Sequence, residues 1–120
     1  MTLKECFEAL GGNYDEVLGR LRSERLIQKF TLKFLEDGSY DLLCRSMESG
    51  DYAEAFRAAH TLKGVCQNLS FTRLYSSSAQ LCEALRNGFT PEAPGLFDLT
   101  TQDYALTVAA IRDFQASIPQ

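Results

Sequence analysis

The only histidine of the chain, His60, is followed on the same sequence segment by Lys63 and Gly64. Residues three and four positions apart share one face of a helix, so the Lys63 ammonium is expected beside the imidazole. A cation there would stabilise a doubly negative phosphoryl group. Glycine inside a helix costs about 1 kcal/mol relative to alanine, which suggests that something must approach the helix closely at Gly64. This pattern favours a histidine that carries a phosphoryl group.

The helix expected to hold His60 opens at Asp51, which forms a capping-box pattern with Glu54, and runs to about Leu69. At about 100° per residue, its apolar residues cover one broad arc that excludes His60: Ala55, Ala58, Ala59, Leu62, Val65, Cys66 and Leu69. The outward neighbours of His60 are Ala53, Phe56, Arg57, Lys63, Gly64 and Gln67. The small side chain of Ala53 protrudes little from the helix, so a partner can reach the imidazole. We therefore expect an exposed imidazole with a partner-binding surface around it.

Each of these features has a simpler explanation when it is taken alone. A lone histidine is more often structural than functional, Lys63 is then a solvated surface lysine, and Gly64 permits close packing between helices. The three residues nevertheless coincide on one predicted helix face around the only histidine. This coincidence favours the chemical interpretation.

Composition limits the class of protein. The chain has 120 residues, of which 45% are apolar and 23% charged, as expected for one soluble globular domain over residues 1–120. A formal net charge of −4 argues against nucleic acid as a partner. No apolar run approaches the ~20 residues that cross a bilayer, and the N-terminus lacks the apolar core of a secretory signal. We expect a cytoplasmic protein without membrane contact.

The sequence predicts no metal centre and no nucleotide site. The four cysteines are far apart, include no Cys-x-x-Cys pair, and have only one histidine to complete a zinc site: Cys6, Cys44, Cys66 and Cys82. Their apolar surroundings indicate reduced core side chains. There is also no glycine-rich nucleotide loop and no acidic metal cluster. We therefore expect no cofactor and no autonomous kinase activity.

Helical periodicity dominates the rest of the chain, and no strand alternation is evident. Besides the histidine helix, helices are expected at about 3–10, 14–20, 24–36, 40–49, 71–87 and 97–117. Thr2, Asn13, Ser23 and Ser39 are the expected N-terminal caps of the first four. Short connections favour antiparallel neighbours. The predicted fold is all-α, an antiparallel four-helix bundle with short extra N-terminal helices.

The segment from Ala59 to Leu69, Ala-His-Thr-Leu-Lys-Gly-Val-Cys-Gln-Asn-Leu, resembles the signature of histidine-containing phosphotransfer (Hpt) domains. The likeness extends upstream to residue 48 and through the following helix, so nearly the whole chain has a counterpart. The resemblance implies that His60 accepts a phosphoryl group, that Lys63 stabilises it and that Gly64 leaves room for the partner. It also implies a monomeric carrier of a two-component phosphorelay, with response-regulator receiver domains or a hybrid sensor kinase as partners. Mg²⁺ is then expected on the receiver.

Two positions depart from the family pattern. The family usually has glycine where this chain has Ser70, and a left-handed residue other than glycine costs about 1–2 kcal/mol, so we expect a rearranged turn. The family also often has a polar residue in the next helix that forms a hydrogen bond with the second histidine nitrogen. The equivalent position here is Cys82, a weak hydrogen-bond partner. Ser78 and Gln67 are the other candidates for orienting the imidazole. These departures leave open an adaptor that binds receiver or kinase domains without transferring phosphate.

Overall fold

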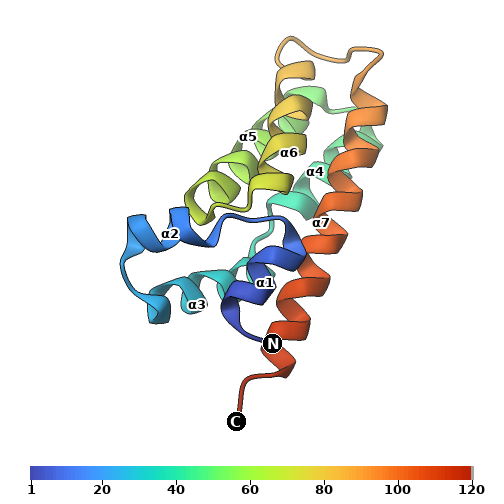
Figure 1. Cartoon of the computed structure of the whole chain (residues 1–120). Helices are drawn as coiled ribbons and strands as arrows, with labels where there is room; N and C mark the ends of the chain where they lie inside the picture. The colour runs from blue at the N-terminus through green and yellow to red at the C-terminus, as the bar shows by residue number, and fades with distance from the viewer. Residues whose placement is uncertain (120) are drawn as a thin grey trace.

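The computed structural model describes residues 1–119, and within that range the chain is helical without any strand (Figure 1). Gln120, the last residue of the predicted domain, lies outside the described range. In chain order the helices are α1 (Leu3–Leu10), α2 (Tyr14–Leu21), α3 (Glu24–Lys33), the 3-10 helix η1 (Phe34–Glu36), α4 (Ser39–Ser49), α5 (Tyr52–Leu69), α6 (Thr72–Ala84) and α7 (Ala93–Ala116). The prediction of an all-α fold is confirmed.

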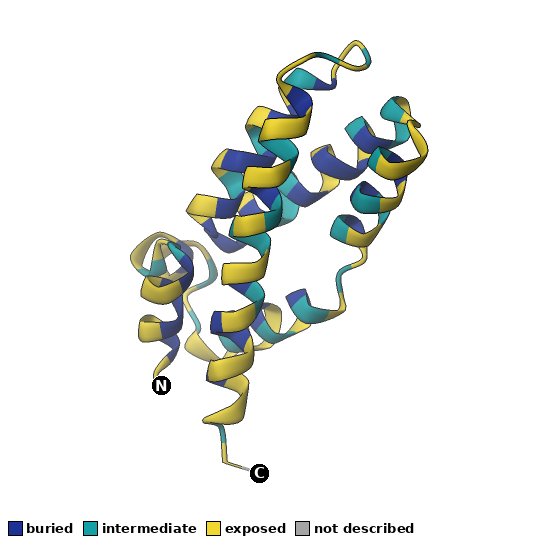
Figure 2. Cartoon of the chain, turned by 90° about the vertical axis from the view of Figure 1, so that its right-hand side faces the viewer, coloured by how far each residue is buried: buried dark blue, intermediate teal, exposed yellow. Residues whose placement is uncertain are grey.

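The last four α-helices form the predicted antiparallel bundle (Figure 1). α5 packs between α4 and α6, and α6 packs along α7. Each helix contributes a fully buried side chain to the core that they share: Leu43, Leu62, Leu81 and Ile111. Figure 2 shows the buried faces of these helices turned toward one another. The core is therefore a continuous apolar column along the bundle axis.

The short N-terminal helices cover one end of this column. α1 packs against the C-terminal half of α7, and α2 and α3 form a pair that extends away from the bundle (Figure 1). At the junction the Phe71 ring lies between two others, 5.5 Å from Phe7 and 5.2 Å from Phe34, both edge-on. This aromatic cluster joins the N-terminal helices to the start of α6.

Four of the predicted caps are confirmed. A side-chain oxygen of each accepts a hydrogen bond from the backbone N–H three residues on: Thr2, Asn13, Ser23 and Asp51. The prediction that Ser39 caps α4 is wrong, because Ser39 is already helical and its N–H donates to the Asp37 carboxylate at 2.9 Å. Neither Asn13 nor Asp51 has a complete capping box, since Glu16 and Glu54 bind other side chains.

Three helix boundaries differ from the prediction. The helix expected to reach residue 36 ends at Lys33 and continues as a 3-10 turn, and Phe30 on it is exposed. α6 ends at Ala84, earlier than expected. α7 begins at Ala93, ahead of the expected residue 97, because Pro94 sits in the first turn, where a helix needs no N–H donor.

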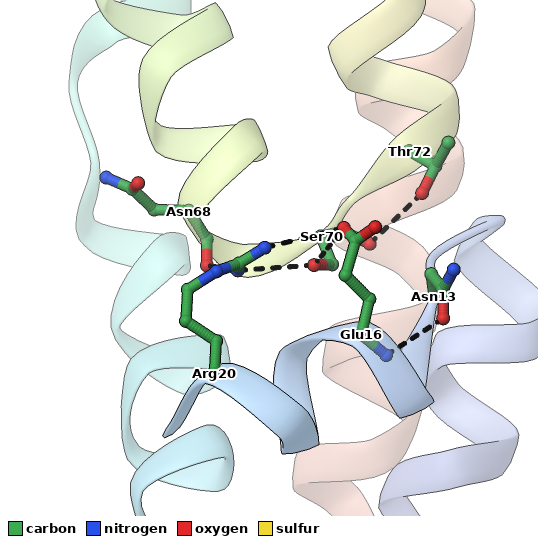
Figure 3. Close-up of polar contacts among 6 residues, drawn as sticks. All are labelled: Asn13, Glu16, Arg20, Asn68, Ser70 and Thr72. Carbon is green, nitrogen blue, oxygen red and sulfur yellow. Dashed lines mark hydrogen bonds and ion pairs between the residues drawn. The ribbon is translucent and has the colours of Figure 1, made fainter. Parts of the chain in front are cut away.

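The turn between α5 and α6 is the most informative departure (Figure 3). Ser70 adopts the left-handed conformation with φ 58°, so the expected rearrangement is wrong. Its hydroxyl donates to a Glu16 carboxylate oxygen at 2.6 Å and accepts from Arg20 at 3.3 Å. Arg20 also donates to the carbonyl of Asn68 at 2.5 Å. Side chains of α2 thus offset the strain of a residue other than glycine at this turn.

The backbone of the same turn is bound to the turn between α1 and α2. The Asn13 N–H donates to the Ser70 carbonyl at 2.9 Å, and the Arg73 N–H donates to the Gly11 carbonyl at 3.1 Å. A Cβ at Gly12 would lie 2.9 Å from the Ser70 carbonyl oxygen, so only glycine permits this approach. The end of the histidine helix is therefore fixed from two sides.

Substitutions of Ser70 test this account. Ser70→Ala removes the hydrogen bond to a partly exposed carboxylate and keeps the strained Cβ, so the free energy of unfolding should fall by about 1–2 kcal/mol. Ser70→Gly loses the same hydrogen bonds but relieves the left-handed strain, so it should be about 1 kcal/mol more stable than Ser70→Ala. Urea denaturation of the three proteins measures both differences. Wild-type stability in Ser70→Ala would show that the hydroxyl does not hold the turn.

Candidate functional site

His60 lies midway along α5, and its side chain is exposed to solvent. The predicted apolar arc on the other side of α5 is buried, apart from the half-buried Val65. The predicted orientation of the helix is therefore confirmed. The helix is amphipathic enough that its packing alone turns the imidazole outward.

The imidazole is nevertheless in contact with α6. The Nδ1 atom of His60 lies 4.0 Å from the Sγ atom of Cys82, the long end of the range for a hydrogen bond to sulfur. The Phe56 ring lies beside the imidazole, with 6.2 Å between ring centroids. Because Nδ1 is turned toward α6, Nε2 is the nitrogen on the open side of the ring. A nucleophilic Nε2 requires the proton of the neutral imidazole to be on Nδ1.

Cys82 is suited to accept a weak hydrogen bond from the Nδ1–H of His60. Its side chain is buried, and this burial raises the pKa of the thiol, while the positive charges of Lys63 and Arg86 lower it in part. Cys82 therefore remains a neutral thiol near neutral pH, with sulfur lone pairs that can accept a hydrogen bond from Nδ1–H. Sulfur is a weaker acceptor than an amide oxygen, so the imidazole is oriented but loosely held.

The other two candidates for orienting the imidazole lie elsewhere. The Ser78 hydroxyl is buried and donates to the carbonyls of Leu74 at 2.7 Å and Tyr75 at 3.1 Å on its own helix. Gln67 is exposed two turns along α5 and makes no hydrogen bond to His60 within the described range. Of the three candidates, the structure brings only Cys82 to the ring.

Two cationic side chains act on Cys82 beside the histidine, one from α5 and one from the turn after α6. Lys63 of α5 is half-buried and close enough to Cys82 to affect its pKa, and no carboxylate in residues 1–119 forms an ion pair with it. Arg86, in the turn that follows α6, pairs with Glu83 at 2.9 Å and lies 5.4 Å from the centroid of the Phe56 ring. Sequence reasoning missed Arg86 as a site residue. Its position one turn after Cys82 was the available signal.

The surface around the histidine is open at Gly64. A Cβ built there would meet no atom within 4 Å, so Gly64 is not required for packing between helices. Ala53, Arg57 and Gln67 of the predicted partner-binding surface are exposed, and Phe56 is half-buried. Arg57 is held along α5 by an ion pair with Glu54. These residues form one accessible face of α5 that extends on both sides of the imidazole.

Three further properties concern residues 1–119 alone. No group of three histidine, cysteine, aspartate or glutamate side chains in this range is placed to hold a metal ion. None of the helices in this range is both long and apolar enough to span a membrane. Three of the four cysteines are buried, and Cys44 is half-buried; none forms a disulfide.

Comparison with known proteins agrees with the geometry of this site. A family model for the Hpt domain matches residues 15–114, a range that includes the whole of α3 to α6 and most of α2 and α7. Searches of curated proteins and of solved structures gave no match. Hpt domains are phosphocarrier modules rather than kinases, and they interact with receiver domains and kinases in two-component phosphorelays. Since the match covers most of its length, the chain belongs to the Hpt domain family.

Proposed function

We propose that this protein accepts a phosphoryl group on Nε2 of His60 from a phospho-aspartate of one receiver domain and passes it to another. The observation that carries the proposal is an exposed imidazole whose Nδ1 is turned toward Cys82, which leaves Nε2 on the open side of the ring. The charges of Lys63 and Arg86 both lower the pKa of the Cys82 thiol beside it. The donor belongs to a response regulator or a hybrid sensor kinase. The carrier works as a cytoplasmic monomer, without a cofactor of its own.

The transfer is a displacement at phosphorus. The Nε2 lone pair forms the new P–N bond while the P–O bond of the acyl phosphate breaks, and the aspartate leaves as a carboxylate. The proton on Nδ1 stays in place during this step and makes the ring cationic, so the Cys82 sulfur faces a stronger donor. Transfer to the second receiver is the reverse reaction. Mg²⁺ on each receiver neutralises the charge that gathers on the carboxylate and the phosphoryl group.

The residues around His60 divide the remaining tasks. Lys63 and Arg86 supply positive charge to the phosphoryl oxygens. Gly64 leaves space for the loops of the receiver, which must bring phosphorus within about 3–3.5 Å of Nε2. Ala53, Phe56, Arg57, Gly64 and Gln67 form the surface on which the receiver rests. An adaptor without transfer activity would use the same surface but would not need the flanking cations.

A phosphotransfer assay tests the proposal. A panel of receiver domains is charged with acetyl phosphate and Mg²⁺ and then mixed with the protein. The wild type should gain a phosphoryl group that is labile in acid and stable in base, and His60→Gln should gain none. A label that persists in His60→Gln would contradict the proposal. Binding to a receiver without any labelling of the wild type would establish the adaptor instead.

Replacement of Lys63 should affect chemistry without affecting folding. Lys63→Ala should change the free energy of unfolding by less than about 0.5 kcal/mol, because the side chain makes no ion pair within the described range. Its transfer rate should fall about tenfold or more, since a charge-assisted contact is lost. Lys63→Arg should recover part of the rate, and Lys4→Ala, at an exposed position of α1, should match the wild type. Wild-type transfer by Lys63→Ala would remove this residue from the mechanism.

Replacement of Gly64 should affect docking alone. Gly64→Gln should raise helix propensity by somewhat under about 1 kcal/mol and still block the receiver, so transfer from the receiver should be nearly lost. A small donor such as phosphoramidate should still label His60 at the wild-type rate. The control is Gly19→Gln on α2, where a Cβ also meets no atom within 4 Å. Normal transfer from the receiver to Gly64→Gln would place the docking face elsewhere.

A further inference from the structure

A groove of about 610 Å³ lies between α4 and α7. α4, α5, α6 and α7 pack in succession, so this groove is on the side of the bundle away from the α5–α6 contact, where His60 lies. The floor of the groove is aromatic and apolar, with side chains from α4, from the start of α5, from the segment that leads into α7 and from α7 itself: Tyr40, Met47, Tyr52, Phe89 and Phe97. We call this feature the α4–α7 groove.

The floor of the α4–α7 groove is ordered yet accessible. The Tyr40 ring stacks on Tyr104 at 3.9 Å and its hydroxyl is 2.9 Å from the Thr101 hydroxyl. Tyr52 contacts Phe89, with 5.2 Å between ring centroids, and Phe89 is 52% exposed. Fixed aromatic side chains and an adaptable methionine are typical of the centres of protein interfaces. The groove therefore presents a preformed apolar surface to a partner.

The rim of the groove is acidic. Glu48 of α4 and Asp98 of α7 line it from opposite sides, and both are exposed. Neither Glu48 nor Asp98 forms an ion pair within residues 1–119.

The acidic rim of the groove favours a partner that carries positive charge. A second copy of the chain, packed symmetrically, would place its own carboxylates against Glu48 and Asp98, and like charges across an interface are costly. Nucleic acid and anionic membranes are repelled for the same reason. We propose that the α4–α7 groove binds an amphipathic helix of another protein, whose apolar face rests on the aromatic floor and whose Lys or Arg residues face Glu48 and Asp98.

The position of the groove allows a partner to bind there while a receiver binds at His60. His60 and Cys82 lie between α5 and α6, whereas the groove lies between α4 and α7 on the other side of the bundle. A helix in the groove therefore leaves the receiver surface free. A kinase or regulator that carries such a helix would hold the protein near its receivers and raise their effective concentration. This interaction is independent of the proposed phosphotransfer.

A peptide of about 18 residues, roughly five helical turns, probes the groove directly. It carries Leu and Phe on one face and Lys on the other, with a fluorophore for anisotropy. One control peptide replaces Lys by Glu, and another replaces Leu and Phe by Ser. The first peptide should bind with an affinity that falls as salt is added, and neither control should bind. Failure of the Lys-bearing peptide to bind, or equal binding of all three, would overturn the proposal.

Paired charge reversals locate the binding site. Glu48→Lys combined with Asp98→Lys should weaken binding of the Lys-bearing peptide at least about tenfold. Glu8→Lys combined with Asp113→Lys changes the net charge equally at exposed positions that do not line the groove, and should have a much smaller effect. Circular dichroism shows whether each variant is folded. Equal weakening by the two pairs would reduce the interaction to net charge and overturn the proposal.

The alkylation rate of Cys44 measures occupancy of the α4–α7 groove in the wild-type protein. It lines the groove and is half-buried, whereas the other three cysteines are buried. With the peptide at about ten times its Kd, alkylation of Cys44 by iodoacetamide should slow about tenfold, while labelling of His60 by phosphoramidate should be unchanged. An unchanged alkylation rate would overturn the proposal. So would protection that grows with the concentration of the protein alone, since that identifies a second copy as the occupant.

Discussion

The packing of α5 between its two neighbours determines the rest of the structure. Its buried arc includes three alanines, Ala55, Ala58 and Ala59, whose small side chains let α4 and α6 approach closely. Rotation of α5 about its axis would replace this arc with Arg57 or His60 and bury a polar group without a partner. The apolar arc thus fixes the azimuth of the helix. The exposed imidazole is a consequence of that constraint.

The azimuth alone does not place a hydrogen-bond partner beside the imidazole. Cys82 reaches Nδ1 only because the turn at Ser70 sets the register of α6 against α5. That turn is held by Glu16 and Arg20 of α2, so a short N-terminal helix contributes to the geometry of a site that it does not touch. Where the family usually has glycine at this turn, the chain has Ser70, which side chains of α2 hold in place. Where the family often has a polar residue beside the imidazole, the chain has Cys82.

The parts of this structure that follow from local rules could be predicted from the sequence. The caps at Thr2 and Asp51, the helix around His60 and its outward orientation depend on residues a few positions apart. The conformation of Ser70 could not be predicted, because its partners Glu16 and Arg20 lie 54 and 50 positions away in the sequence.

The same distinction applies at the site and at the groove. The sequence offered Gln67, Ser78 and Cys82 as partners of the imidazole, and only the packing of α6 on α5 selects Cys82. Arg86 joins the site through the same packing. The groove between α4 and α7 has no signature in either helix, because it depends on how the whole bundle closes. Long-range packing, rather than helix pattern, limits what the sequence reveals.

The central claim is that His60 reacts through Nε2 while Nδ1 faces Cys82. The most direct measurement is nitrogen NMR of the protein labelled with ¹⁵N at histidine, before and after phosphorylation by a charged receiver. The account predicts a proton on Nδ1 in the phosphorylated protein and coupling between ³¹P and Nε2. Coupling between ³¹P and Nδ1, or a phosphorylated protein in which neither nitrogen of His60 is coupled to phosphorus, would contradict it.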